Sequence, residues 1–483
     1  MSIEKYDVVI GLEVHVQLRT NSKMFCSCAN QYGAEPNTTI CPVCTGYPGV
    51  MPVPNHEAIK KTIIAGMMCS CDIPELSKFD RKSYFYPDMP KNYQISQYDL
   101  PFCTKGTIHI FGKGFSGEAL PDKKIGITRI HLEEDVAKST HYASFSGIDY
   151  NRAGVPLMEI VSEPDMTTAD EAYAYLTNLK LIMQYGSISD CDMEKGQMRC
   201  DVNISLKPKG RKEFGTKIEL KNLNSFRSVH RGINHEITRQ ADLLEQGVAL
   251  QQETRGWNDD RGATYLMRVK ESAHDYRYFP EPDLTPIRFT SDELEKLRKE
   301  LPELPAQMAE RFARDFELTP YDAQVLTSEK DLAEYFNAGA KGTKSPKFLA
   351  NWIISELLRE ISKAGITIKE TKVSAENLAK LVDMIQSNVI NGKIGKIVFE
   401  EMFATGKDPE SIVKEKGLVQ VTDESAIVEF VKKAISDNPS QVAEYKAGKT
   451  AVLQYFVGQV MKVSKGKANP PTVIKLLKEQ LDA

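Results

Sequence analysis

The sequence predicts an α+β protein with a β-rich first part and two helical parts after it. Residues 1–290 are rich in Gly, Pro, Tyr and short runs in which hydrophobic and polar residues alternate, which is typical of strands joined by turns. From Ser291 onward, hydrophobic residues recur at helical spacing instead. A chain of 483 residues, at about 150 residues per domain, also predicts roughly three domains.

Local signals place the domain boundaries. The segment from Thr290 to Glu293 has the pattern of a capping box, which begins a helix. The segment from Gly406 to Pro409 has the composition of a turn. Between them, a helical stripe is formed by Leu378, Leu381, Val382, Ile385 and Val389. We therefore predict a β-rich domain at 1–290, a helical domain at 291–405 and a small helical tail domain at 406–483.

Composition excludes several classes of protein. The 62 Lys and Arg and the 66 Asp and Glu give a net charge of −4, so the chain is not a generally basic nucleic-acid coat protein. The sequence contains no run of about 18 apolar residues, so no membrane-spanning helix is expected. Glu13 and His15 interrupt the N-terminal hydrophobic stretch, which is not typical of a secretory signal. Nine cysteines are an odd number, which argues against a disulfide scaffold. We expect a cytoplasmic protein that does not bind membranes.

Several predicted strands carry one polar face. In Val9–Leu18 the hydrophobic residues alternate with Glu13, His15 and Gln17. The same alternation recurs in Met198–Leu206 and Lys217–Asn222, whose polar faces contain Asp201, Asn203, Ser205, Glu219 and Lys221. Residues two apart on a strand lie on the same side, roughly 7 Å apart, so they can approach one ion or ligand.

Two further runs add carboxylates to this pattern. His131 is followed by Glu133, Glu134 and Asp135 at the end of a strand, and Glu159 interrupts a nearly continuous apolar run. A carboxylate in apolar surroundings is costly unless it is paired or bound to a metal. One interpretation is an ordinary sheet with one solvated face. The other is a group of carboxylates that holds Mg²⁺ for a phosphate substrate. The sequence lacks the phosphate-binding loops of P-loop enzymes and protein kinases.

Four cysteines form two closely spaced pairs, Cys26 and Cys28, then Cys41 and Cys44, with twelve residues between the pairs. Two such pairs suit a structural Zn²⁺ with four thiolate ligands. The alternatives are reduced, buried thiols or a redox pair. The remaining cysteines, Cys69, Cys71, Cys103, Cys191 and Cys200, are expected to be core thiols.

Two segments suggest contact with nucleic acid. Arg81–Asp88 interleaves two cations with three aromatic rings, which can stack on bases and hold phosphates, although an ordinary packed loop has the same composition. The segment from Tyr445 to Lys478 has seven Lys and no Asp or Glu in a chain that is net acidic. That charge pattern favours binding to a phosphate backbone, and a solvated lysine face is the alternative.

Longer motifs give the sequence a family resemblance that covers essentially the whole chain. The motifs that carry it are Gly11–His15, Phe79–Asp88, Tyr93–Gln97, His131–Asp135, Glu159–Pro164, Glu219–Ser225 and Asp275–Asp283. With these motifs the sequence resembles the B subunit of the bacterial aspartyl/glutamyl-tRNA amidotransferases, the GatCAB complexes. The resemblance implies a β-rich cradle followed by a helical domain and a helical tail that contacts tRNA.

The resemblance also implies an activity. Proteins of this kind use ATP and Mg²⁺ to phosphorylate the side-chain carboxylate of Glu-tRNA(Gln) or Asp-tRNA(Asn). Ammonia that the amidase subunit of the complex releases from glutamine then displaces the phosphate, and a small third subunit completes the heterotrimer. A non-catalytic tRNA-binding scaffold with a structural metal site is the alternative function. A zinc-dependent hydrolase would need an open coordination position, which four cysteines do not leave.

Site residues follow from the same resemblance. The implied ligands of the catalytic metal are His15, Glu134, Glu159, Asp201 and Glu219, with Glu13 and Glu133 nearby. We expect Glu13, His15, Glu133 and Glu134 to be catalytic. Lys82 is expected to contact a phosphate or the tRNA 3′ end, and Tyr84 to stack on the adenine or on a base. Some family members lack the four cysteines, so zinc at Cys26, Cys28, Cys41 and Cys44 is expected to be structural.

Overall fold

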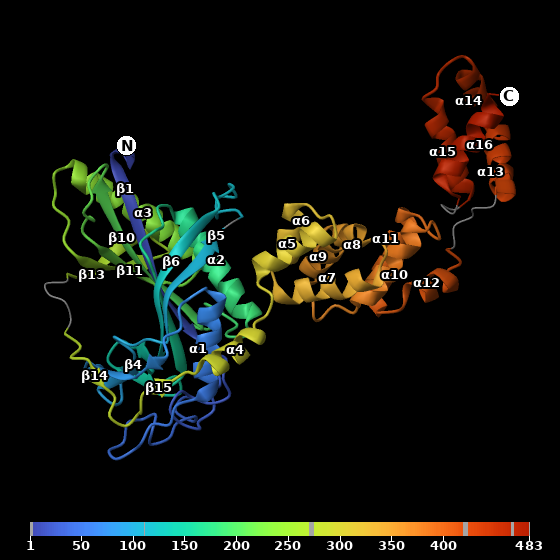
Figure 1. Ribbon diagram of the computed structural model, residues 1–483. Coiled ribbons are helices and arrows are strands. Elements are labelled where there is room, and N and C mark those ends of the chain that lie inside the picture. Colours follow the sequence, from blue (N-terminus) through green and yellow to red (C-terminus); the bar gives the residue numbers. More distant parts are fainter. Residues whose placement is uncertain (1–2, 111, 270–274, 419–423, 465–467, 483) are drawn as a thin grey trace. The chain divides into compact units, whose positions relative to one another are not determined.

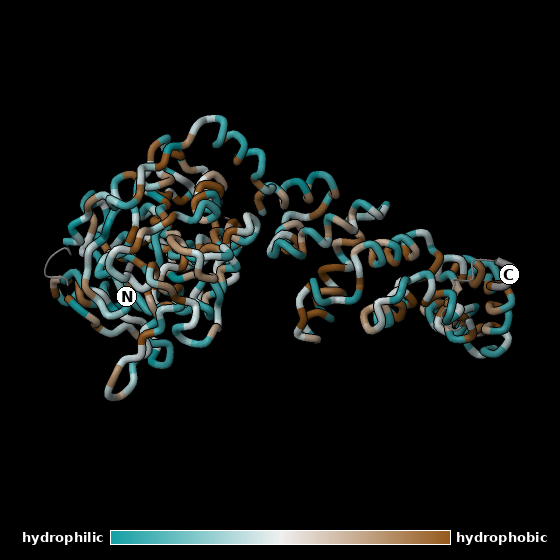
Figure 2. Tube along the Cα trace, turned by 90° about the horizontal axis from the view of Figure 1, so that it is seen from below, coloured by the Kyte–Doolittle hydropathy of each residue, from teal (hydrophilic) through white to brown (hydrophobic). Residues whose placement is uncertain are grey.

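The computed structural model describes residues 3–110, 112–269, 275–418, 424–464 and 468–482 of the chain (Figure 1). The chain divides into two compact units, Met1–Pro305 and Ala306–Ala483, which are described separately. Hydrophobic and hydrophilic positions alternate along the chain in both units, as amphipathic strands and helices require (Figure 2). Among the described residues, no helix has both the length and the apolar character needed to cross a membrane.

An eight-stranded sheet forms the centre of the first unit. In spatial order its strands are β13 (Ala263–Val269), β12 (Glu253–Asn258), β11 (Ile218–Leu223), β10 (Met198–Pro208), β1 (Tyr6–Gln17), β9 (Pro156–Ser162), β6 (Lys123–Glu134) and β5 (Cys103–Ile110). All neighbours are antiparallel except β11 and β12, which are parallel and are joined through a helix. The long strand β1 therefore pairs with β10 on one side and with β9 on the other.

Three helices cover one face of this sheet: α1 (His56–Met68), α2 (Ala169–Tyr185) and α3 (Phe226–Glu245). Each begins at a polar cap, as Asn55 does for α1 by accepting the backbone N–H groups of Glu57 and Ala58. Leu12, Val14 and Val16 of β1 are buried in the resulting core. Because side chains alternate along a strand, the residues between them face the opposite side of the sheet. That opposite face is the polar face predicted from the sequence.

Short strands lie beside the main sheet. They form three small sheets, β14 (Phe279–Pro280) with β3 (Asp80–Ser83) and β4 (Tyr93–Ser96), β15 (Ile287–Arg288) with β2 (Leu76–Ser77), and β7 (Lys138–His141) with β8 (Ser146–Asp149). Strand β4 contacts the end of β6, where the side chain of Gln94 donates a hydrogen bond to the carbonyl oxygen of Glu134 at 2.7 Å. The small sheet that contains β3 is thereby fixed next to the polar face.

Helix α4 (Ser291–Lys299) begins at the predicted capping box. The hydroxyl of Thr290 accepts the Glu293 N–H, and the Glu293 carboxylate accepts the Thr290 N–H, which confirms the capping box. Leu294 and Leu297 of this helix pack on the core of the first unit. A domain boundary at residue 290 would therefore place α4 in a different domain from the core that it contacts. The first compact unit of the structure extends to Pro305.

The second unit is helical. Its helices are α5 (Pro305–Asp315), α6 (Pro320–Leu326), α7 (Lys330–Gly342), α8 (Pro346–Trp352), α9 (Leu358–Ala364), α10 (Ala375–Gln386), α11 (Gly392–Thr405) and α12 (Pro409–Glu415), followed by α13 (Glu424–Ser436), α14 (Pro439–Lys446), α15 (Val452–Val463) and α16 (Pro470–Leu481). A π-helical turn, Ile353–Leu357, joins α8 to α9. A β-rich unit followed by helices confirms the predicted α+β class.

The predicted helical stripe is present in part. Leu378, Leu381 and Val382 are buried on α10, whereas Val389 lies beyond the helix end and is exposed. The predicted turn at Gly406 is also present, because this glycine ends α11 with a positive φ of 77°. Helix α12 follows the turn and contacts α10 and α11. The boundary predicted at 405/406 therefore separates α12 from the helices that it contacts.

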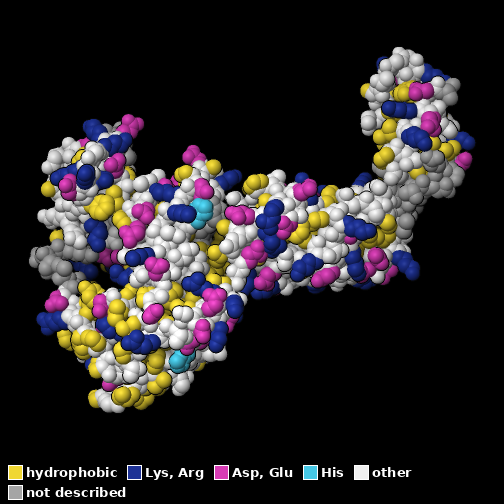
Figure 3. All heavy atoms as spheres, viewed as in Figure 1, with side chains coloured by type: hydrophobic (Ala, Val, Ile, Leu, Met, Phe, Trp, Pro, Cys, Tyr) yellow, Lys and Arg dark blue, Asp and Glu magenta, His cyan; other side chains and the backbone are white. Residues whose placement is uncertain are grey.

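Helices α13, α15 and α16 enclose their own core, which contains Val431, Phe456, Val460 and Leu477. Of the seven lysines of the acid-free segment, Lys465 and Lys467 lie outside the described residues. On the visible face of the second unit, acidic and basic side chains are interspersed (Figure 3). The predicted division into three domains remains a proposal.

Candidate functional site

Strand register brings three of the polar side chains into one row. His15 of β1 lies directly opposite Glu159 of β9, and Glu159 lies directly opposite His131 of β6. Residues that are directly opposite on neighbouring strands point to the same face, with their Cβ atoms roughly 5 Å apart. Glu133 is two residues after His131, so it joins the row from the same side of the sheet.

These four residues, His15, His131, Glu133 and Glu159, form what we call the acidic cluster. The Glu159 carboxylate is 3.2 Å from Nε2 of His15 and 3.5 Å from Nε2 of His131. The Glu133 carboxylate is 3.6 Å from His131 and 4.0 Å from His15. Ligand atoms of His15, Glu133 and Glu159 all lie within 4.8 Å of one another. The arrangement thus places two carboxylates and an imidazole around a single point.

Electrostatics keep both carboxylates ionised although they are buried. Burial alone would raise the pKa of Glu133, but its interaction with His131 and the charge of Lys82 outweigh burial and lower it. For Glu159, the neighbouring His131 and His15 likewise overcome burial and lower the pKa. Burial would lower the pKa of His15, and Glu159 and Glu133 together raise it instead. The cluster is therefore a site of negative charge that attracts cations.

Lys82 and several aromatic rings lie beside the acidic cluster. Burial would lower the pKa of Lys82, but the charges of Glu133 and Glu159 raise it, so its ammonium group is stabilised there. Nζ of Lys82 is 5.1 Å from the centre of the Tyr276 ring, and Tyr84 contacts the same ring edge-to-face. Tyr278 stacks on Tyr98 with ring centres 4.4 Å apart. Both residues expected to contact substrate, Lys82 and Tyr84, thus belong to this site.

At the ends of β1 and β10 the polar face continues into a second network. Arg199 donates to the Asp135 carboxylate at 2.9 Å, and Gln17 donates to the same carboxylate at 2.9 Å. Burial would raise the pKa of Asp135, but Arg199 and Arg152 lower it. Gln17, Arg152 and Arg199 also line a cavity of about 840 Å³. This network connects the acidic cluster to an open, polar space.

Three predicted carboxylates form a separate group on β1, β10 and β11. Glu13 lies opposite Asp201, which sits at an irregularity in the pairing of β10 with β11. Lys221 forms ion pairs with Asp201 and, at 3.2 Å, with Glu219. The side chain of Asn203 donates to Glu13 at 2.8 Å. The register thus brings Glu13, Asp201 and Glu219 to neighbouring strands, with a lysine between the last two.

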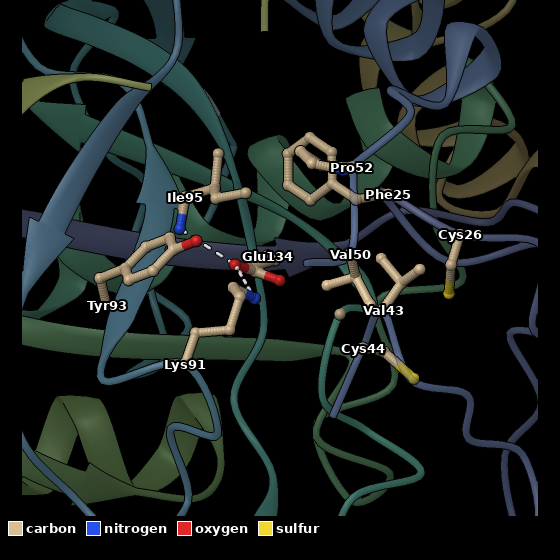
Figure 4. Close-up of a pocket in the computed structure, with 11 residues that line it drawn as sticks. Phe25, Cys26, Val43, Cys44, Val50, Pro52, Lys91, Tyr93, Ile95 and Glu134 are labelled. Carbon is tan, nitrogen blue, oxygen red and sulfur yellow. Dashed lines mark hydrogen bonds and ion pairs between the residues drawn. The ribbon is translucent and has the colours of Figure 1, made fainter. Parts of the chain in front are cut away.

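Glu134 lies apart from the acidic cluster. It follows Glu133 on β6, so its side chain leaves the other side of the strand. Its carboxylate is 2.6 Å from Nζ of Lys91 and accepts the Ile95 N–H at 3.0 Å. Figure 4 shows the pocket that it enters, with the Lys91–Glu134 pair on one side and Cys26 and Cys44 on the other. The structure therefore does not bring Glu134 together with His15 and Glu159.

The four predicted cysteines converge, with sulfur atoms within 4.8 Å of one another. We call Cys26, Cys28, Cys41 and Cys44 the cysteine cluster. A turn holds the second pair, because the Thr45 N–H donates to the carbonyl oxygen of Cys41 and the Cys41 N–H donates to Sγ of Cys44. A hydrogen bond from Cys26 lowers the pKa of the Cys44 thiol to about 4. The other five cysteines are buried or half-buried thiols without disulfides.

Several residues of the site are not evident from the sequence. The sequence shows His131 only as part of a strand, and its role becomes visible through its position opposite Glu159. Arg199 precedes Asp201 by two residues, so strand alternation alone could have placed it on the polar face. Lys91 and Tyr276 come from loops, for which the periodicity of the sequence gives no signal.

Comparisons with known proteins agree with this architecture. The sequence profile of the GatB/GatE catalytic domain matches residues 8–295, and the profile of the GatB domain matches residues 334–481. The first match contains the eight-stranded sheet with both clusters, and the second contains most of the helical unit.

Relatives match over nearly their full length. The B subunit of the aspartyl/glutamyl-tRNA(Asn/Gln) amidotransferase of Carboxydothermus hydrogenoformans is 51% identical over 484 residues, which is 99% of each chain. The proteins of the same name from Thermoanaerobacter pseudethanolicus and Persephonella marina are each 52% identical, and both alignments cover 99% of this chain and at least 99% of the relative. These matches confirm the resemblance seen in the motifs. The chain belongs to the GatB family, whose members include the B subunits of aspartyl/glutamyl-tRNA(Asn/Gln) amidotransferases.

Proposed function

We propose that this chain is the component of a glutamine-dependent tRNA amidotransferase that activates a misacylated tRNA with ATP and then amidates it. The substrates are Glu-tRNA(Gln), Asp-tRNA(Asn) or both, and the products are Gln-tRNA(Gln) and Asn-tRNA(Asn). The observation that carries the proposal is the buried acidic cluster with Lys82 beside it. It occurs in a chain whose relatives of nearly equal length are named as B subunits of such enzymes.

The chemistry requires activation because a carboxylate is a poor electrophile for ammonia. Transfer of the γ-phosphoryl group of ATP to the side-chain carboxylate gives an acyl phosphate and ADP. Ammonia then attacks the carbonyl carbon, the C–N bond forms, phosphate leaves with the electrons of the C–O bond, and the nitrogen loses a proton. Both reactants of the first step are anionic, so the site must position them and neutralise their charge.

The acidic cluster fits a divalent cation. Two buried carboxylates and one neighbouring ammonium leave a net negative charge when both imidazoles are neutral, and Nδ1 of His131 is buried without a hydrogen-bond partner among the described residues. We assign His15, Glu133 and Glu159 as residues that would hold Mg²⁺, which would supply charge neutralisation for phosphoryl transfer. Lys82 would contact the transferred phosphate, and Tyr84 with Tyr276 would stack on the adenine or on the tRNA 3′ end.

The remaining predicted ligands receive different assignments. Glu13, Asp201 and Glu219 are the candidates for a second cation position, at which Lys221 now supplies the positive charge. Glu134 is proposed to support the site from outside the acidic cluster, because Lys91 and the Ile95 N–H hold its carboxylate. The cysteine cluster fits a structural Zn²⁺, because four convergent sulfur atoms leave no position open for a substrate.

The partners follow from the reaction. A separate amidase subunit would release ammonia from glutamine, and a small third subunit would complete the heterotrimer. The acid-free lysine segment at the C-terminal end, whose described lysines include Lys446, Lys462 and Lys478, is the candidate contact for the tRNA backbone.

One assay separates this function from its alternative, a tRNA-binding scaffold without chemistry of its own. The heterotrimer is supplied with ATP and either Glu-tRNA(Gln) or Asp-tRNA(Asn), and ADP formation is measured with free ammonia as the nitrogen donor. ADP that depends on the misacylated tRNA supports the enzyme. Tight tRNA binding without ADP formation from either substrate would establish the scaffold instead.

A further inference from the structure

Lys23 is a completely buried lysine next to the cysteine cluster. Its side chain is 0% exposed, and its Nζ lies 3.6 Å from Sγ of Cys44 and 3.3 Å from the carbonyl oxygen of Tyr150. In the part of the chain that the structure describes, no carboxylate oxygen lies within 4.0 Å of this Nζ. A buried ammonium group without a counter-charge is costly, so its position requires an anion nearby.

The surrounding structure holds Lys23 against the cysteines. Gly154, at φ +82°, packs closely on the site, because a Cβ at this position would lie 3.3 Å from Cβ of Cys44 and 3.6 Å from Cδ of Lys23. The Lys23 N–H also donates to the carbonyl oxygen of Cys28 at 3.0 Å. Glu134 lies across Gly154, but its carboxylate is engaged by Lys91 at 2.6 Å. Sulfur is thus the anionic partner that remains for Lys23.

The chemistry of a metal-loaded cysteine cluster supplies the missing charge. A Zn²⁺ ion with four thiolate ligands has two negative charges in excess. This net negative charge must be compensated when the site is partly buried. N–H groups that donate to metal-bound thiolates offset this charge and make the sulfur less nucleophilic. Among the described residues, Lys23 is the one cation whose ammonium nitrogen lies within hydrogen-bond distance of a cluster sulfur.

We propose that Lys23 is the charge-compensating partner of the zinc-loaded cysteine cluster, donating an N–H···S hydrogen bond to Cys44 that stabilises the bound metal and protects this sulfur from electrophiles. The proposal rests on the assignment of zinc to the cysteine cluster. It gives Lys23 a positioning role towards the metal site and none in the amidation reaction. If Lys23 were only a space-filling residue, an uncharged side chain of equal length would serve as well.

The test compares Lys23→Met with a matched control in the full-length chain. Lys123→Met removes another lysine with a buried partner, Glu171 at 2.9 Å, far along the chain from the cysteines. Both variants are purified with zinc, their folding is checked by circular dichroism and thermal unfolding, and zinc transfer to a chromophoric chelator is measured. Alkylation of each cysteine by iodoacetamide is followed by peptide mass spectrometry.

We expect Lys23→Met to lower the zinc affinity by about 10- to 100-fold and to accelerate alkylation of Cys44 more than that of Cys28. Lys123→Met should change the thermal midpoint without changing either readout. Co²⁺ substituted for zinc gives a second signature, because loss of the N–H···S bond should shift the sulfur-to-cobalt charge-transfer absorption in Lys23→Met alone.

Three results would overturn or separate the proposals. Wild-type protein that binds no zinc would refute the zinc assignment itself. If the wild type binds zinc and the zinc affinity of Lys23→Met differs from it by less than about twofold, the role of Lys23 is refuted and the zinc assignment stands. If Lys23→Met does not fold, the same measurements are made on Lys23→Gln, whose side chain keeps an N–H donor but has no charge. If neither variant folds, the labelling of the Lys23 amine is compared in zinc-loaded and chelator-treated wild type. Equal labelling in the two states overturns the proposal.

Discussion

The acidic cluster and the cysteine cluster are both groups of potential metal ligands, but they are assembled in opposite ways. The four cysteines come from one loop region, within nineteen positions of the sequence from Cys26 to Cys44. The acidic cluster takes residues from three strands, β1, β6 and β9, with His15 and Glu159 more than a hundred positions apart. One cluster is thus defined by local spacing and the other by strand register.

This difference has physical consequences for each cluster. Soft sulfur donors in a loop depend on the metal to hold them together, because no strand pairing of the main sheet fixes their positions. The carboxylates and imidazoles of the acidic cluster are fixed by the sheet before any ion binds, and the ammonium group of Lys82 already balances part of the negative charge. Loss of a ligand should therefore affect stability at the cysteine cluster and activity at the acidic cluster.

The largest expected effect is that of Glu159→Gln on activity. Gln keeps the shape but removes the charge between His15 and His131, so phosphoryl transfer should fall by about 10²-fold or more. Metal analysis should still find zinc at the cysteine cluster, and tRNA binding should be little changed. ADP formation and amidation with free ammonia check this outcome. A near wild-type rate of amidated tRNA formation would remove the acidic cluster from the mechanism.

The second-largest expected effect is a loss of stability caused by Cys41→Ser. Loss of one thiolate should release one zinc equivalent and lower the free energy of unfolding by on the order of 3 kcal/mol, with a thermal midpoint lower by about 5 °C or more. Specific activity per folded molecule should persist. Thermal unfolding and zinc analysis of the purified protein provide the measurement, and activity lost in protein that stays folded and zinc-loaded would contradict a purely structural role.

A sharper comparison uses the neighbours Glu133 and Glu134. Glu133→Gln should abolish most tRNA-dependent ADP formation, because its carboxylate belongs to the acidic cluster. Glu134→Gln should affect ADP formation less and instead lower stability by about 1–3 kcal/mol, because it weakens the pair with Lys91. Both rates and both thermal midpoints are measured in parallel. Equal loss of ADP formation in the two variants would instead support the role expected from the sequence, in which Glu134 is a ligand of the catalytic metal.

The smallest expected effect tests a purely local feature. Thr290→Ala removes the hydroxyl that caps α4, and with it the two hydrogen bonds that this hydroxyl makes with Glu293, at a cost of about 1 kcal/mol. Urea unfolding followed by circular dichroism measures this change, with Thr319→Ala at the start of α6 as a control cap in the other unit. A destabilisation by Thr290→Ala of more than about 3 kcal/mol would mean that the residue does more than cap a helix.

Sequence reasoning was reliable where structure is local. The capping box at Thr290 and the convergence of the cysteines follow from spacing within a few turns of chain. Alternation along β1 also placed Glu13 and His15 on one face correctly, because every second residue from Ile10 to Val16 is hydrophobic and buried. The position of Val389 was wrong because the helix ends at Gln386, before the hydrophobic stripe does.

Register was the part that could not be predicted. Which residue of β9 lies opposite His15 depends on the pairing of strands far apart in the sequence. At the end of β6, Glu133, Glu134 and Asp135 follow one another without a hydrophobic residue between them. Alternation with Ile130 and Leu132 indicates that Glu133 shares a face with His131, but the sequence does not show which residues of the neighbouring strands each carboxylate meets. Only the pairing with β9 and the contact with β4 decide it.

The alternation of β6 has a consequence for how the protein can change in length. Because Glu133 and Glu134 leave opposite sides of the strand, one residue inserted upstream within β6 would move each carboxylate to the other face of the strand and place Leu132 at the position of Glu133. An insertion between the cysteine pairs would leave the ligands in place, since residues 31–38 are largely exposed. Natural variation in chain length should therefore accumulate in that loop and be absent from β6.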